Sequence, residues 1–193
     1  MTIFDKEKSM NLAKMATEKL SLSGNIPKEK LEVEFQKAYK EFFELINQAI
    51  FYDSTNTYAF YWKGKVELQN ELFVESLNTF EQYLEMQPYD FSNDHYWSVN
   101  KAVFLLKKKL GLTNFEKNLN TLLKISEDRI KLNQKNADNL TLKLAFFLYS
   151  GNKPKAIEFI KKEKENLGNE SYFLELVDNF SLQPIIDNIK EQI

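Results

Sequence analysis

The sequence has no cysteine and only one histidine, His95, among its 193 residues. Without cysteine the chain has no disulfide, no thiolate metal ligand and no cysteine nucleophile. A single imidazole excludes almost every zinc centre, and any serine–histidine triad would have to use that one ring. The sequence therefore predicts no metal site, no cofactor and no catalytic residues, so it favours a protein that binds over an enzyme.

Glycine and proline are also scarce, with 5 Gly and 4 Pro in the whole chain. Ordinary proteins contain roughly 7% and 5% of these residues. Sheet proteins and glycine-rich phosphate loops need more of them for their turns, and no Gly-x-x-x-x-Gly-Lys, Gly-x-Ser-x-Gly or Gly-x-Gly-x-x-Gly motif is present. The scarcity favours helices joined by short connections.

Charge of either sign is not in excess, because 26 basic residues stand against 28 acidic ones and the net charge is −2. A dedicated nucleic-acid binder needs a positive surplus to neutralise phosphates. The amino terminus lacks the apolar segment of a signal peptide. The longest apolar run, Leu144–Tyr149, is far shorter than the ~20 residues that span a bilayer. We expect a cytoplasmic protein that binds neither nucleic acid nor a membrane.

Apolar residues recur at helical spacing along the chain, and no segment alternates as a strand would. We expect an all-α fold with at least about 65% helix, roughly twice the usual fraction. The pattern predicts about nine helices in all. The ten candidate segments are Asp5–Leu20, Pro27–Tyr52, Thr57–Asn70, Leu72–Gln87, one capped by Ser92 or Asn93 and ending at Leu110, one capped by Thr113 with Glu116 in a capping box, Asn136–Tyr149, Pro154–Asn166, Ser171–Phe180 and Pro184–Gln192.

The window Thr57–Pro88 holds residues at spacings that suit a helical hairpin. Gly64 and Ser76 would let two helices approach closely, Phe80 would fill the seam between them, and Pro88 would end the second helix. This window resembles a tetratricopeptide repeat (TPR), a helix–turn–helix unit of 34 residues. Tyr83 departs from the repeat pattern at a position where Ala is usual.

The resemblance implies a right-handed α-solenoid of antiparallel helix pairs, with capping helices at both ends. We expect one helical-repeat domain over residues 1–193. It comprises an N-terminal helix in 1–22, TPR-like pairs in 23–168 with the best unit at 57–90, and C-terminal capping helices in 169–193.

In TPR units the first helix, helix A, lines a concave groove that binds the partner. Carried over by resemblance, the partner-binding positions are Tyr58, Tyr61, Lys65, Leu68, Tyr96 and Asn100. Tyrosine and tryptophan suit interface anchors because they bury a large area and keep one polar atom. Tyr61 and Tyr96 are either such anchors or core residues, and Trp62 and Trp97 are expected in the core.

Two other clusters have a chemical and a structural interpretation. His95 follows Asp94 at a helix start, and the chemical interpretation is a general base oriented by Asp94. Because adjacent residues on a helix do not face each other, we expect an exposed first-turn residue instead. The Lys107–Lys109 run is expected to be favourable charge at a helix C-terminus, with a phosphate or acidic-peptide contact as the alternative.

Taken together, the sequence predicts a non-catalytic protein–protein interaction module that binds a peptide or partner helix in a concave helix-A groove. The alternative is an immunity-type or inhibitor protein that blocks one specific toxin or enzyme by surface complementarity. This alternative requires no groove.

Overall fold

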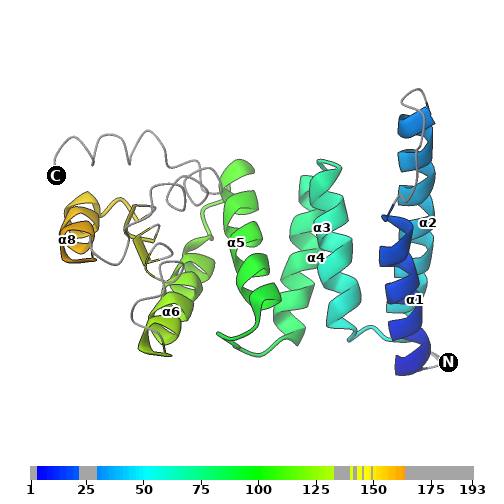
Figure 1. The fold of residues 1–193 in the computed structure, drawn as a ribbon, viewed down its shortest axis with the longest axis horizontal. Coiled ribbons are helices and arrows are strands. Elements are labelled where there is room, and N and C mark those ends of the chain that lie inside the picture. Colours follow the sequence, from blue (N-terminus) through cyan, green and yellow to red (C-terminus); the bar gives the residue numbers. More distant parts are fainter. Residues whose placement is uncertain are drawn as a thin grey trace. The chain divides into compact units, whose positions relative to one another are not determined.

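The computed structural model describes residues 4–21, 30–132, 140, 143–144, 146–148 and 150–163. All regular elements within these ranges are α-helices, so the predicted all-α fold is confirmed there (Figure 1). The helices are α1 (Lys6–Lys19), α2 (Leu31–Tyr52), α3 (Thr57–Gln69), α4 (Phe73–Met86), α5 (Asp94–Lys109), α6 (Glu116–Leu132) and α8 (Lys153–Glu163). The capping helices expected in 169–193 and the predicted helix start at Pro27 lie outside the described residues.

Side-chain caps set several helix starts where the sequence predicts them. The Lys8 amide donates to the Asp5 carboxylate (2.9 Å) at the start of α1. At α5 the cap is Asn93 rather than Ser92, because the Asn93 side chain accepts from the Tyr96 amide (3.2 Å). Each such cap satisfies amides that the helix itself leaves unpaired.

The predicted capping box of Thr113 with Glu116 is wrong, because α6 begins only at Glu116. The Phe115 carbonyl accepts from the amides of Asn118 and Leu119 at 3.1 Å each. The Phe115 ring also packs edge-on against Phe104, with 5.6 Å between the ring centroids. This aromatic contact fixes the chain just before the helix and leaves Thr113 outside it.

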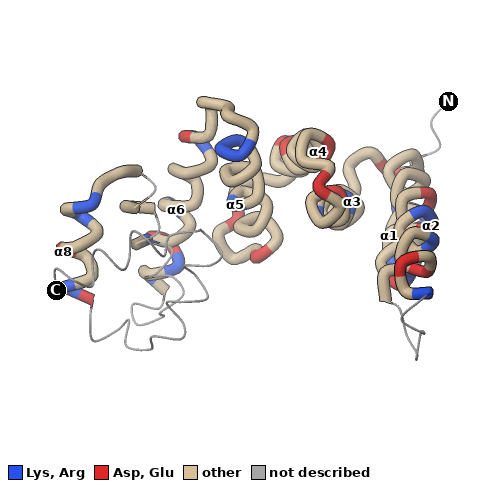
Figure 2. The backbone as a smooth tube through the Cα atoms, turned by 90° about the horizontal axis from the view of Figure 1, so that it is seen from above, with Lys and Arg blue, Asp and Glu red and all other residues tan. Residues whose placement is uncertain are grey.

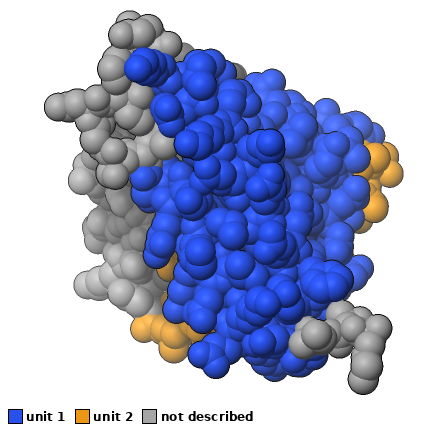
Figure 3. Space-filling view, turned by 90° about the vertical axis from the view of Figure 1, so that its right-hand side faces the viewer, with its two compact units in different colours: residues 1–88, 105–111 blue, residues 89–104, 112–193 orange. Residues whose placement is uncertain are grey.

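The chain divides into two compact units, Met1–Pro88 with Leu105–Gly111 (unit 1, blue in Figure 3) and Tyr89–Phe104 with Leu112–Ile193 (unit 2). Unit 1 contains two helix pairs, α1 with α2 and α3 with α4. The single helical-repeat domain over 1–193 stays a prediction.

The first pair closes over small residues. Ala13 and Ala16 of α1 are fully buried, as are Phe42 and Ile46 of α2. Because alanine adds almost no bulk, α1 lies close to the larger α2 side chains, and the buried apolar area stabilises the pair.

The second pair closes at Gly64, as the repeat spacing predicts. A Cβ at this position would lie 2.5 Å from Cε1 of Phe80, so only glycine leaves room for the ring. The Ser76 hydroxyl donates to the Gly64 carbonyl at 2.9 Å. The expected close approach of Gly64 and Ser76 is confirmed, and we call this contact the α3–α4 seam.

Glu67 is also buried beside this seam, with a residue exposure of 5%. Burial raises the pKa of its carboxyl, and a hydrogen bond from Thr79 and the charge of Lys63 offset only part of this rise. The Lys63 ammonium lies 3.9 Å away, and one carboxylate oxygen, Oε2, has no hydrogen-bond partner. Burial without full hydrogen bonding disfavours the charged form of an acid.

Gly64→Ala should overpack the α3–α4 seam. The Phe80 ring is buried and rigid, so the new methyl group displaces it at a cost of roughly 1–3 kcal/mol of unfolding free energy. A thermal melt should show a lower Tm for Gly64→Ala, whereas the exposed control Gln69→Ala should change little. A Gly64→Ala protein as stable as the wild type contradicts the close approach.

Glu67→Gln should stabilise the protein at neutral pH. Because the folded-state pKa is raised, the folded state favours the protonated acid, and stability from this site is lost as pH rises through that pKa. The gain should therefore be present at pH 7 and shrink as pH falls toward the ordinary glutamate pKa, about 4.3. Urea unfolding across this range, with exposed Glu85→Gln as control, measures it, and destabilisation by Glu67→Gln at pH 7 contradicts it.

Candidate partner-binding surface

Three side chains of α3 share one side of the helix and remain partly accessible. We call Tyr58, Trp62 and Lys65 the α3 face, since steps of four and three residues place them in one stripe. Tyr58 and Trp62 pack on the core between α1 and α2 along part of their rings. The Tyr58 and Trp62 ring centroids lie 6.3 Å apart in an edge-on arrangement. The result is an aromatic surface with a lysine at one end.

The Lys65 ammonium is held over two aromatic rings. Its Nζ lies 4.9 Å from the Trp62 centroid and 5.5 Å from that of Tyr61. The ring faces attract the cation and limit its motion. Leu68, the next predicted position along α3, is half-buried.

Tyr61 lies deeper than the α3 face, with an exposure of 7%. Its ring contacts Trp62 at 5.6 Å and Tyr83 of α4 at 6.4 Å between centroids. Tyr61 is therefore a core residue in this structure, which is one of the two positions expected for it. Its contribution to binding stays a prediction.

Tyr96 and Asn100 belong to unit 2 and are also buried. The Tyr96 ring meets Tyr89 edge-on at 6.0 Å, and the Asn100 amide donates to the Tyr96 carbonyl at 2.9 Å. The Asn118 amide in turn donates to the Asn100 side-chain oxygen at 3.3 Å. The prediction that these two residues share one surface with the α3 positions stays a prediction.

Lys101 of α5 repeats the lysine–tryptophan contact of α3, and the sequence analysis did not predict this contact. Its Nζ lies 5.2 Å from the Trp97 ring centroid, and burial lowers the pKa of its ammonium. Trp62 and Trp97 are both half-buried, and both have a buried Nε1 without a hydrogen-bond partner. The available signal was a lysine three or four residues after each tryptophan, which places it on the same helix side.

We compared the chain with known protein families, curated proteins and solved structures. No protein-family model and no curated protein matches the sequence. Among solved structures, the chain is similar to the crystal structure of YrrB, a TPR protein with an unusual peptide-binding site. The two share 17% sequence identity and a TM-score of 0.52 over 93% of this chain and 89% of YrrB.

The chain has a TPR-like fold. The predicted α-solenoid of helix pairs is confirmed at the level of the fold. The assignment of α3 and α4 as helices A and B of a unit at 57–90 stays a prediction. The part of the chain that the structure describes contains no helix long and apolar enough to cross a bilayer.

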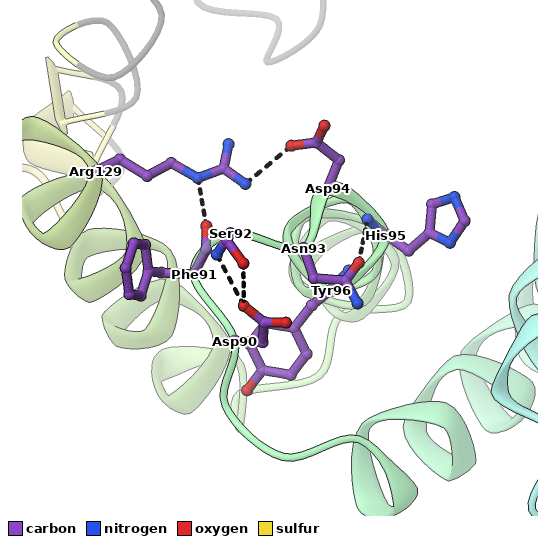
Figure 4. Close-up of polar contacts among 8 residues, drawn as sticks. All are labelled: Asp90, Phe91, Ser92, Asn93, Asp94, His95, Tyr96 and Arg129. Atoms are coloured by element: carbon purple, nitrogen blue, oxygen red, sulfur yellow. Dashed lines mark hydrogen bonds and ion pairs between the residues drawn. The ribbon is translucent and has the colours of Figure 1, made fainter. Parts of the chain in front are cut away.

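In this TPR-like chain, Asp94, the residue before His95, makes a structural ion pair. Asp94 pairs with Arg129 of α6 at 2.9 Å, and the His95 ring points away from Asp94 (Figure 4). The Arg129 Nε also donates to the Phe91 carbonyl at 2.6 Å, so the one arginine of the chain joins α6 to the turn before α5. No cluster of His, Cys, Asp or Glu that could hold a metal occurs among the residues that the structure describes.

The lysine run at the end of α5 also has structural contacts within unit 1. Lys107 is buried and pairs with Glu81 of α4 at 2.8 Å. The Lys109 ammonium lies 3.7 Å from the centroid of the Phe73 ring. These contacts support the interpretation of this run as structural charge.

Arg129→Lys should weaken unit 2 although it keeps the positive charge. The planar guanidinium reaches Phe91 and Asp94 simultaneously, and an ammonium on a shorter branch does not reproduce that fork. We expect a loss of about 1 kcal/mol in unfolding free energy, measured by urea denaturation. Lys117→Arg, an exposed exchange on the same helix, is the control, and unchanged stability of Arg129→Lys contradicts the two-point contact.

Proposed function

We propose that the protein is a non-catalytic protein–protein interaction module that binds a peptide or a partner helix on its helix-A side. The observation that carries this proposal is the TPR-like fold combined with the partly accessible α3 face, which lies on the helix predicted to be a helix A. YrrB, which has a similar fold, is itself a TPR protein with a peptide-binding site. Tyrosine and tryptophan surfaces of this kind are typical of binding hot spots.

The six predicted binding residues have different roles in this proposal. Tyr58, Lys65 and Leu68 are half-buried and contact the partner directly. Tyr61 supports the α3 face from beneath through its contacts with Trp62 and Tyr83. Tyr96 and Asn100 belong to unit 2, and their part in binding stays a prediction.

Burial changes which variant tests binding. Tyr61→Ala removes a core ring, and truncating a buried aromatic costs roughly 3–5 kcal/mol of stability. A loss of binding by that variant would therefore also follow from unfolding. Tyr58 is the better target because its ring is partly accessible and its hydroxyl makes only one long contact, 3.5 Å to the Thr17 hydroxyl.

Tyr58→Ala should weaken partner binding by about 30-fold, the effect of removing a ~2 kcal/mol hot spot. Calorimetric titration with the partner captured from the native cells measures this, with circular dichroism to verify folding. Phe51→Ala on α2, which removes an aromatic ring that is 64% exposed, is the matched control and should bind normally. Normal binding by both Tyr58→Ala and Lys65→Ala would contradict the proposed surface and favour an inhibitor that uses another face.

A further inference from the structure

The first turns of α2 extend past the end of α1 within unit 1 (Figure 1). At one end of this helix pair the Lys8 ammonium donates to the Tyr52 hydroxyl at 2.7 Å. At the other end Lys19, the last residue of α1, pairs with Glu41 at 2.9 Å. Residues 31–37, which we call the start of α2, therefore lie beyond the helix that packs along the rest of α2.

The apolar stripe by which α2 faces the core continues into this start. Ala38 and Phe42 of the stripe are buried. Phe35 and Leu31 precede them at the same helical spacing, yet these two residues are 37% and 38% exposed. The Phe35 ring stacks on Tyr39 with 6.3 Å between the ring centroids, which limits its motion. An accessible ring that is already held in position loses little freedom on binding, so the start of α2 suits a contact.

A row of charges lies beside this stripe, and both signs occur along α2 (Figure 2). The row consists of Lys30, Glu34, Lys37 and Glu41, which follow the spacing of the stripe and alternate in sign. Among the residues that the structure describes, neither Glu34 nor Lys37 takes part in an ion pair. These two charges can therefore meet charges from outside the chain.

The charge row is complementary to its own reverse. In an antiparallel contact between two copies of α2, centred between Phe35 and Gln36, Glu34 of each copy faces Lys37 of the other. A parallel contact would instead set each charge against a like charge, which is unfavourable. The antiparallel arrangement also brings the two Phe35 rings together at its centre.

We propose that the start of α2 binds the start of α2 in a second copy of this chain, in an antiparallel two-fold contact. The two Phe35 rings pack at the centre, and two Glu34–Lys37 ion pairs flank them. A second copy is the occupant because the apolar stripe and the charge row match their own reverse. Each copy contributes only a few turns of one helix, which is typical of weak, reversible interfaces.

Sedimentation equilibrium of the full chain measures this association. The weight-average mass should rise from that of one chain, 22.8 kDa, toward twice that value as the concentration increases. A range from about 5 µM to about 500 µM covers weak, reversible contacts. The mass of one chain throughout this range would overturn the second copy as the occupant.

Charge reversal tests the register of the contact. Glu34→Lys and Lys37→Glu each set like charges against each other in both halves of the contact, so each variant should dimerise about tenfold more weakly. An equimolar mixture of the two variants should associate as the wild type does, because every opposed pair then has opposite signs again. The control Lys40→Glu, an exposed exchange on the other side of α2, should leave dimerisation unchanged.

Truncation of the central ring tests the apolar part of the contact. Phe35→Ala should weaken dimerisation by about tenfold or more, because both copies lose the ring at the centre. Val33→Ala is the matched control, since it shortens a side chain that is 67% exposed on the opposite side of α2. Circular dichroism verifies that each variant is folded.

Two further results would overturn the contact. Dimerisation that neither charge variant weakens would place the interface elsewhere on the chain. Two weakened variants whose mixture stays monomeric would exclude the antiparallel register. Neither result bears on the proposed function, because no residue of the α3 face is part of this contact.

Discussion

The contact between Gly64 and the Phe80 ring is the constraint on which the α3–α4 pair depends. A ring that occupies the place of a Cβ allows one separation and one rotation between the helices, and the Ser76 hydroxyl on the Gly64 carbonyl holds the same arrangement. Because helical residues keep a constant angular spacing, this rotation also decides which side chains of α3 point away from α4. Tyr58, Trp62 and Lys65 form an accessible face because Phe60 and Gly64 are buried.

The helices and this seam could be predicted from the sequence because they rest on local rules. Asp and Asn are preferred at helix N-caps, so Asp5 and Asn93 indicate where helices start. Glycine, serine, phenylalanine and proline at the spacing of the repeat each indicate a packing position in a helical hairpin. The sequence left open whether Tyr61 is an interface anchor or a core residue, because helix periodicity gives the direction of a side chain but not its depth. Its depth depends on Tyr83, a large ring where the repeat pattern has alanine, and the two rings pack 6.4 Å apart.

Electrostatic detail was predictable only in part, for a related reason. The lysine run at the end of α5 could be assigned to structural charge, but its partners Glu81 and Phe73 are distant in sequence. Similarly, nothing local to Arg129 indicates that it joins Asp94 and Phe91 across 35 or more residues.

A double-mutant cycle between Gly64→Ala and Phe80→Leu tests the central contact most directly. If the ring and the added methyl group compete for one space, the smaller leucine relieves the clash, and the double variant is more stable than the sum of the single effects predicts. We expect a coupling free energy of about 1 kcal/mol or more from urea unfolding of the four proteins. Strictly additive losses would show that Gly64 and Phe80 do not share that space, and the orientation assigned to the α3 face would then lose its basis.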